Sequence, residues 1–188
     1  IYSRVTTAFA ISRVIEKNLL DTCPITPDKI ALLHNAVDTN HFDPAKADRN
    51  KLRREFSITD DEVLIGMVAR FSKGKGHEEM IDAAVELNKK FNNLRYLIVG
   101  EASKGEDEYA EKIKNYAASK NLPNMIFTGF RNDTREVQAA LDIFVFPSHN
   151  EAFGIALAEA LSMGVPSVCS NSDGILDIAD DGVTSYLF

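Results

Sequence analysis

Hydrophobic residues beyond about residue 60 fall into short apolar runs that alternate with amphipathic stretches. The runs are compact, as in strands buried on both sides, and the stretches between them space their apolar residues by three or four, as in helices. Strands are predicted at 63–69, 94–99, 125–128, 143–147, 166–170 and 184–188. Helices are predicted at 77–91, 106–120, 133–141, from about 153 to 161, and at 175–179. Asp133 and Glu136 have the spacing of a capping box at the start of one helix.

Strands that alternate with helices and are apolar throughout indicate a parallel sheet covered on both faces. Right-handed crossovers then predict an α/β fold, a Rossmann-like doubly wound domain. Such sheets bind ligands beyond the carboxyl ends of their strands. The loops that follow residues 69, 100, 129, 147 and 170 are therefore the candidate sites.

The first sixty residues follow a different pattern, with a strand predicted at 7–11, a helix at 12–20 and a strand at 30–33. Prolines at 24, 27 and 44 interrupt this stretch, which is typical of the edge of a neighbouring domain followed by a linker. The length of 188 residues suits one domain with some extra chain. The chain does not begin with Met, and we expect it to be a fragment of a longer protein.

Composition narrows the class of protein. Hydrophobic residues make up 45% and charged residues 26%, which is ordinary for a globular protein. Lys plus Arg number 21 against 28 Asp plus Glu, so the formal charge of −7 argues against a nucleic-acid-binding protein. No apolar run reaches the roughly 20 residues that a bilayer requires, and no signal peptide is visible. Two distant cysteines do not indicate a disulfide framework, so we expect a reducing, cytoplasmic compartment.

The loop after residue 69 contains Arg70, Lys75 and two glycines between a strand end and a helix start. Glycines allow a ligand to approach the backbone, and a helix N-terminus offers unpaired N–H groups to an anion. Arg70 can bind phosphate oxygens in a fork and Lys75 as a point charge. A solvated turn with surface lysines is an equally good interpretation of this loop alone. The glycines do not complete a dinucleotide fingerprint.

The loop after residue 147 gives a sharper signal. Glu151 precedes a predicted helix N-terminus, and Glu159 follows about two turns later in an almost wholly apolar helix. The backbone amides of Phe153, Gly154 and Ile155 lie between the two acids. Carboxylates accept hydrogen bonds from hydroxyl groups, so this layout suits a ligand with hydroxyls at both ends and phosphate in the middle. The alternative is a Glu that favours the helix dipole, but a buried Glu159 would then lack a partner.

Other polar residues have plain interpretations. The four histidines are scattered and no metal site is predicted; His149, beside the Glu151 loop, is expected at the surface. Lys51, Arg53 and Arg54 are expected to form the solvated face of a helix.

Several motifs together resemble one family. Glu151 and Glu159, within Pro-Ser-x-x-Glu-Ala-Phe-Gly, resemble the paired-glutamate motif of retaining glycosyltransferases with the GT-B fold, in particular the large family 4 (glycosyl transferases group 1). Four further stretches match in the family's order: Asn35-Ala36-Val37-Asp38 with Phe42, the Arg70 and Lys75 loop, Gly129-Phe130, and 174–182. The resemblance covers essentially the whole chain. Ala36, Asp173, Asp177 and Ser185 depart from the common Gly, Gly, Glu and Gly.

The resemblance implies two Rossmann-like domains with the active site between them. Residues 1–45 would be the tail of the N-terminal domain and a linker, and 46–188 the C-terminal nucleotide-sugar-binding domain, truncated at its C-terminus. Arg70 and Lys75 would hold the donor diphosphate, and Glu151 would contact the transferred sugar. The amides of 153–155 would cover sugar and phosphate, Glu159 would bind the ribose, and Phe130 and Arg131 would abut the base.

The function implied is donor binding in a retaining, hexosyl-transferring glycosyltransferase of polysaccharide or glycoconjugate synthesis, with the fragment alone inactive. The donor would be a sugar linked to UDP or GDP, and no other cofactor is expected. Other partners would be a saccharide or lipid-linked acceptor and the protein's own N-terminal domain; nucleic acid is not expected, and peripheral membrane contact through that domain is left open. The alternatives are a nucleotide-sugar-binding module without turnover and a GT-B sugar-nucleotide epimerase.

Overall fold

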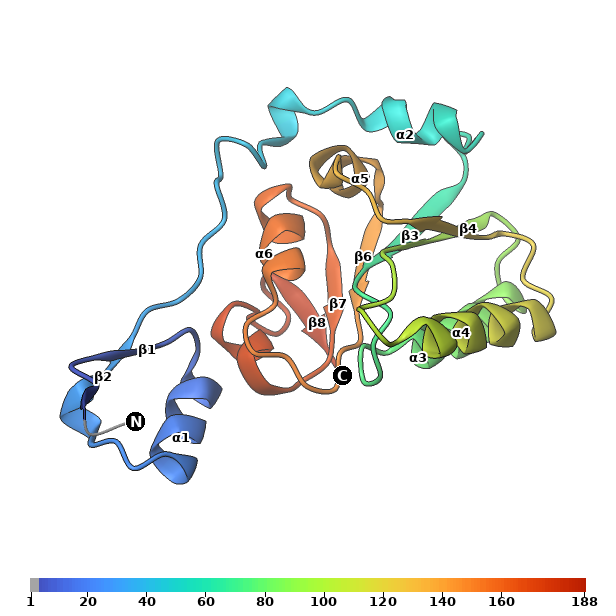
Figure 1. The fold of residues 1–188 in the computed structure, drawn as a ribbon. Helices are drawn as coiled ribbons and strands as arrows, with labels where there is room; N and C mark the ends of the chain where they lie inside the picture. The colour runs from blue at the N-terminus through green and yellow to red at the C-terminus, as the bar shows by residue number, and fades with distance from the viewer. Residues whose placement is uncertain (1–3) are drawn as a thin grey trace.

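A computed structural model describes residues 4–188, which form two separate parallel β-sheets of unequal size (Figure 1). The small sheet pairs β1 (Ala8–Ala10) with β2 (Ile30–Leu32), and helix α1 (Arg13–Thr22) connects the two strands. Ser12 caps α1 by accepting a hydrogen bond from the backbone N–H of Ile15. The chain between β2 and helix α2 (Arg49–Glu55) then leads to the larger sheet.

The larger sheet has six parallel strands in the order β5-β4-β3-β6-β7-β8. The strands are β3 (Val63–Val68), β4 (Leu94–Val99), β5 (Met125–Gly129), β6 (Ile143–Phe146), β7 (Ser167–Cys169) and β8 (Ser185–Leu187). The helices are α2 (Arg49–Glu55), α3 (His77–Asn88), α4 (Asp107–Ser119), α5 (Thr134–Ala140) and α6 (Ile155–Ser162), with short 3-10 turns at η2 (Pro27–Lys29), η3 (Pro44–Lys46) and η4 (Asp173–Asp177).

Successive strand residues point into two different cores, which is why these strands are apolar throughout. Leu64 and Phe144 belong to the core that α5 and α6 cover, whereas Ile65 and Tyr96 belong to the core under α3 and α4. Helices therefore lie on both faces of the sheet (Figure 1). The Rossmann-like, doubly wound α/β prediction is confirmed.

The chain order of the strands reverses between β3 and β6. From β3 the chain adds β4 and β5 on one side, and from β6 it adds β7 and β8 on the other. Two neighbouring strands whose connections leave in opposite directions open a crevice beyond their carboxyl ends, the usual ligand position in open α/β sheets. The loops at 70–76 and 147–154 follow these two strands and therefore meet there.

The expected capping box at the start of α5 is wrong. Asp133 is the N-cap residue but makes no side-chain cap hydrogen bond. Its carboxylate binds the guanidinium of Arg131, and the carboxylate of Glu136 binds Arg135. Charge-assisted bonds to arginine compete successfully with a neutral N–H for the same acids.

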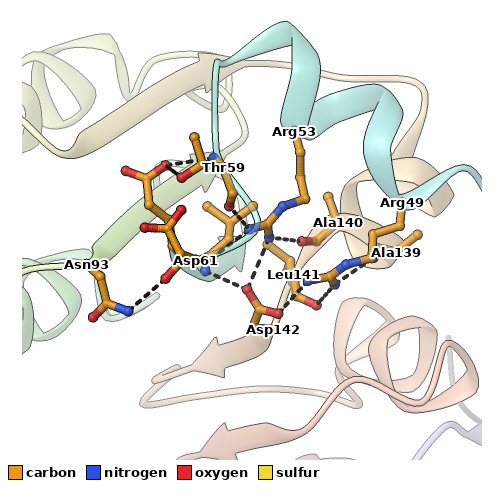
Figure 2. Close-up of polar contacts among 11 residues, drawn as sticks. Arg49, Arg53, Thr59, Asp61, Asn93, Ala139, Ala140, Leu141 and Asp142 are labelled. Atoms are coloured by element: carbon orange, nitrogen blue, oxygen red, sulfur yellow. Dashed lines mark hydrogen bonds and ion pairs between the residues drawn. The ribbon is translucent and has the colours of Figure 1, made fainter.

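The prediction of a solvated basic face on α2 is right for Lys51 and Arg54, which are exposed, but wrong for Arg53, which is only 2% exposed. The Arg53 guanidinium donates to the carbonyl oxygens of Thr59 and Glu62, both at 2.7 Å, and lies 3.1 Å from Asp142 (Figure 2). A single basic side chain thereby joins α2 to the segment before β3 and to the start of β6.

Asp142 completes this cluster at the amino ends of β3 and β6. Its carboxylate accepts the backbone N–H of Leu64 at 2.7 Å and a guanidinium N–H of Arg49 at 2.6 Å (Figure 2). Burial pushes the pKa of Asp142 up, but the hydrogen bonds from Leu64 and the two arginines outweigh it, and the pKa lies below its usual value.

Two departures from the family pattern have a backbone explanation. Asp173, where Gly is common, has a φ of +50°, a left-handed conformation that Asp tolerates better than most residues. Ala36 is not among the described residues with positive φ, as its Cβ requires. Among residues 4–188, no helix has the length and hydrophobicity that a membrane crossing requires.

Candidate active site

The loops after β3 and β6 are held against each other by backbone contacts. The N–H of His149 donates to the carbonyl of Gly74 at 2.8 Å. Gly76 has a φ of +84°, and a Cβ there would lie 2.2 Å from the carbonyl oxygen of Pro147. Only glycine allows this close approach, so the two predicted ligand loops form one rigid unit.

Lys75 and Glu151, one from each loop, form an ion pair of 2.8 Å between Nζ and Oε2. Their side chains are 18% and 15% exposed, so water screens this pair less than a surface pair. From the sequence, the two residues are predicted to make separate contacts with a ligand. The structure brings them together, and the ammonium and the carboxylate each keep hydrogen-bonding capacity for a third group.

Helix α6 starts directly behind this pair. Gly154 is its N-cap residue, with a left-handed φ of +99°, and has no side chain to satisfy the first turn. Within residues 4–188, the N–H groups of Phe153, Gly154, Ile155 and Ala156 donate to no other backbone or side-chain group. Four free amides at a helix N-terminus carry a partial positive charge and favour an anion.

These groups surround two adjoining hollows. The first, about 240 Å³, contains both members of the Lys75–Glu151 pair and the amides of 153–156. The second, about 390 Å³, contains Glu159, Phe130 and Arg131. Both hollows are lined by Val68, Ala69, Arg70, Ile155 and Ala156. They therefore form a continuous groove that runs from Glu151, past the start of α6, to Glu159.

Glu159 is half-buried in the second hollow, and burial raises the pKa of its carboxyl group. Its carboxylate has no hydrogen-bond donor and no cation within bonding distance anywhere in residues 4–188. A desolvated acid without a donor is unfavourable in the free protein. An acid with a pKa perturbed by burial beside an open groove is typical of a functional site.

Arg70 is exposed at the boundary of the two hollows, and one guanidinium N–H donates to Ser103 at 3.3 Å. Ser72 in the same loop donates to Glu106, whose pKa this hydrogen bond lowers. Glu106 and Ser103 therefore anchor the loop that carries Arg70, while most of the guanidinium stays available to an anion.

Phe130 and Arg131, predicted to abut a base, both line the second hollow, but their side chains differ in freedom. Phe130 is 62% exposed and can stack on a planar group. The Arg131 guanidinium is bound on two sides, to Glu55 at 2.7 and 2.9 Å and to Asp133 at 2.8 Å, and both acids raise its pKa. Arg131 thus holds the loop in position, and contact with a base stays a prediction.

Part of the lining comes from the N-terminal segment, where no site residue was predicted. Ile11 and Asn35 come from the N-terminal segment and line the first hollow. Asn35 was noted only as part of a linker motif, and neither residue carries a periodicity that marks a site. The position of the small sheet relative to the large one is a tertiary feature that no local pattern encodes.

The described histidines have different surroundings. His149 is exposed, as expected, and its Nε2 lies 2.5 Å from Glu79. His77 is fully buried and stacked on Phe71 with 4.5 Å between ring centroids, and neither of its ring nitrogens has a hydrogen-bond partner in the described part of the chain. Within residues 4–188, no group of three or more His, Cys, Asp or Glu side chains is arranged to hold a metal ion.

Known proteins resemble this chain in both sequence and fold. The family model for glycosyl transferases group 1 matches residues 48–188. The capsular polysaccharide biosynthesis glycosyltransferase CapM of Staphylococcus aureus is 27% identical over 184 residues, which cover 97% of this chain and 48% of CapM. The chain thus spans about half the length of this curated relative.

Solved structures show the same architecture. Anabaena Alr3699/HepE, crystallised in complex with UDP and glucose, gives a TM-score of 0.87 at 23% identity over 97% of this chain and 49% of that chain. This likeness concerns the fold. The C-terminal domain of LpcC from Francisella tularensis, a glycosyl transferase group 1 family protein, gives a TM-score of 0.69 at 29% identity, covering 81% of this chain and 80% of that one.

Proposed function

Because the chain belongs to the glycosyl transferases group 1 family, we propose that the intact protein transfers a sugar from a nucleoside-diphosphate sugar to an acceptor hydroxyl. Residues 46–188 would bind the donor, and residues 1–45 would belong to the N-terminal domain and the linker. One observation carries the proposal: a half-buried acid that has no partner among residues 4–188 lies in the same groove as two cations and a free helix N-terminus.

The diphosphate fits the first hollow. The amides of 153–156 offer donors to phosphate oxygens, and Arg70 and Lys75 add two positive charges. As the bond between sugar and phosphate breaks, negative charge accumulates on the departing diphosphate. Donors and cations held around this position would stabilise the charge with little reorganisation, and this is how this chain would accelerate the reaction.

Glu151 would orient the transferred sugar. Its Oε2 is bound by Lys75, while its other oxygen is free to accept a hydrogen bond from a sugar hydroxyl. Lys75 in turn has two further N–H donors for phosphate. The ion pair would therefore hold the carboxylate in place before the donor arrives, which lowers the entropy cost of positioning the sugar.

The nucleoside would lie in the second hollow, where Glu159 accepts the two ribose hydroxyls and Phe130 stacks on the base. Ribose hydroxyls are the donors that the Glu159 carboxylate lacks in the free protein. Satisfying a desolvated charge yields more binding energy than adding the same hydrogen bond to a hydrated group, because the alternative state is costly.

The finer features of this function follow the resemblance. They are retention of the anomeric configuration, transfer of a hexosyl group, a UDP- or GDP-linked donor, and a saccharide or lipid-linked acceptor in polysaccharide or glycoconjugate synthesis. The names of CapM and of the HepE complex support polysaccharide synthesis and a uridine diphosphate donor respectively. A cytoplasmic location and peripheral membrane contact through the N-terminal domain belong to the same proposal.

The test is a donor screen on the intact protein. UDP, GDP and their glucose-linked forms are titrated by calorimetry, and each sugar-linked form is then incubated with saccharide acceptors. We expect one diphosphate series to saturate and a glycosidic product whose anomeric configuration, read by NMR, equals that of the donor. Saturable binding without transfer would favour the binding module. Interconversion of the free sugar nucleotide without acceptor would favour the epimerase, and no binding of either series would overturn the proposal.

A further inference from the structure

The first hollow is built from two parts of the chain that lie on different sheets. Most of its lining comes from the loops after β3 and β6, but Ile11 follows β1 and Asn35 lies just beyond β2. These two residues precede the region that the family model matches, residues 48–188. The side chain of Asn35 makes no hydrogen bond to any described residue.

One carboxylate oxygen connects the N-terminal segment to this wall. Asp177 Oδ2, in η4, accepts the backbone N–H of Arg13 at 2.7 Å and lies 3.0 Å from Nε2 of His34. The Asp177 side chain is only 5% exposed. An acid at the first turn of α1 is favoured by the helix dipole, so the contact gains from helix polarity as well as from the hydrogen bonds.

Neighbours of Asp177 also contact Phe153 and the Glu151 loop, which line the first hollow. His34 packs its ring on Phe153, with 5.8 Å between centroids, and is followed directly by Asn35. On the other side, Gly174 of η4 donates its N–H to the carbonyl of Glu151 at 2.9 Å. A Cβ on Gly174 would lie 2.3 Å from the carbonyl oxygen of Ala152, so η4 and the Glu151 loop are in direct backbone contact.

We propose that the Asn35 carboxamide hydrogen-bonds to the sugar–diphosphate end of the bound donor, and that Asp177 is the positioning residue that holds Asn35 over this end. The inference rests on the proposed function and adds a ligand contact from the N-terminal segment to it. Asn35 lines the hollow that contains Lys75 and Glu151 and not the one that contains Glu159, so it contacts the end of the ligand away from the nucleoside.

The experiment uses the intact protein and three probes of increasing length: the nucleoside monophosphate, the diphosphate and the glucose-linked diphosphate of the base series that binds. For Asn35→Ala we expect unchanged affinity for the monophosphate and about tenfold weaker binding of the glucose-linked form, with the melting temperature unchanged. Equal loss for all three probes, or no loss for any, would overturn the contact.

The positioning role of Asp177 is tested by combining its substitution with that of Asn35. Asp177→Ala should weaken the glucose-linked form by a similar factor, and adding Asn35→Ala to it should cost less than threefold more, because Asp177 acts through Asn35. His34→Ala, at a partly exposed residue, removes one arm of the contact without burying an unpaired group and should give a smaller loss in the same direction. Fully additive losses in the double variant would overturn the positioning role.

Two controls separate this role from simple instability. Asp180→Ala, at an exposed acid three residues after Asp177, should leave all three affinities unchanged. Asp177→Glu keeps the charge and should restore most of the affinity, whereas Asp177→Asn, which lacks the charge, should restore less. A wild-type protein that binds neither diphosphate series refutes the proposed function itself, whereas wild-type binding with an unaffected Asp177→Ala refutes only this inference.

Discussion

The charged groups at the two ends of strands β3 and β6 differ in whether the chain provides them with partners. At the amino ends, the acid Asp142 and the buried base Arg53 are surrounded by partners, which leave only the Nε of Arg53 without one (Figure 2). At the carboxyl ends, Arg70 is exposed, and within residues 4–188 the half-buried Glu159 has no donor and four amides at the start of α6 have no acceptor.

The difference separates groups that stabilise the fold from groups that await a ligand. Burying a charge is unfavourable unless hydrogen bonds and an opposite charge compensate for it. Around Asp142, hydrogen bonds and opposite charges from the chain itself compensate for this burial. Around Glu159, the described residues supply no such compensation, and an open groove lies beside the carboxylate. The same two strands thus join a structural charge cluster to a binding site.

The largest effect is expected at the amino ends. Arg53→Ala removes a partner from Asp142 and from three carbonyl groups, and we expect a loss of about 3–5 kcal/mol in the free energy of unfolding. Arg54→Ala, at the exposed neighbour, should change it by less than about 0.5 kcal/mol. Denaturant unfolding of both variants measures the contrast. Equal losses of unfolding free energy in the two variants would show that the buried network around Arg53 does not stabilise the fold.

The next largest effect is expected in the pH dependence of stability, through His77 at the start of α3. Burial, aided by the charge of Lys75, lowers the pKa of His77 to about 4 against the opposing pull of Glu78 and Glu79. The unfolded chain takes up this proton near pH 6.5 and the folded chain only near pH 4, so stability falls as the pH drops through that window. The shift corresponds to about 3 kcal/mol in total.

His77→Leu removes the titrating group without breaking a hydrogen bond, because neither ring nitrogen has a partner. Unfolding free energies measured from pH 7 to pH 4 should therefore fall less steeply in the variant than in the wild type. Parallel curves for the two proteins would show that His77 is not the group responsible.

A smaller effect is expected for the cations of the groove. Arg70→Ala and Lys75→Ala should each weaken diphosphate binding by about 1.5–3 kcal/mol, the range of a hydrogen bond to a charged group. The loss should shrink as salt is added, because salt screens the exposed Arg70 most. Lys104→Ala, at an exposed lysine outside both hollows, serves as the control. Calorimetric affinities that do not vary with salt would contradict the assignment.

The smallest effect is one of stability at Glu159. Its folded pKa is raised, so the folded chain holds this proton more tightly than the unfolded chain, and ionisation costs stability as the pH rises above about 4.5. Glu159→Gln removes this cost, and we expect the melting temperature of the free protein at pH 7 to rise by about 1–2 °C. A lower melting temperature would mean that the carboxylate has a stabilising partner.

The sequence predicts most of the larger sheet because its strands are buried on both sides and its helices are amphipathic, patterns that are local. It also predicts that Arg70, Lys75, Glu151 and Glu159 share one region, since parallel strands end at the same edge. It does not predict the burial of Arg53, because a basic residue on a helix is usually solvated and only the fold brings Asp142 to it.

The contributions of Asn35 and Asp177 are equally hidden from local pattern. The contacts of Asp177 with Arg13 and His34 span 164 and 143 positions of the chain, and they depend on how the small sheet lies against η4. The failure of the capping box at Asp133 has a local origin instead, because Arg131 and Arg135 bind the two acids that the motif assigns to backbone amides.

The most direct test of the binding groove compares ribose and dideoxyribose forms of the diphosphate that binds. Calorimetry on the wild-type protein should show about a tenfold or greater loss of affinity when the 2′ and 3′ hydroxyls are absent. Glu159→Gln should bind the ribose form correspondingly more weakly and discriminate far less between the two. If the wild type binds both forms equally, or the variant discriminates as strongly as the wild type, Glu159 does not recognise the ribose and the account of the groove is contradicted.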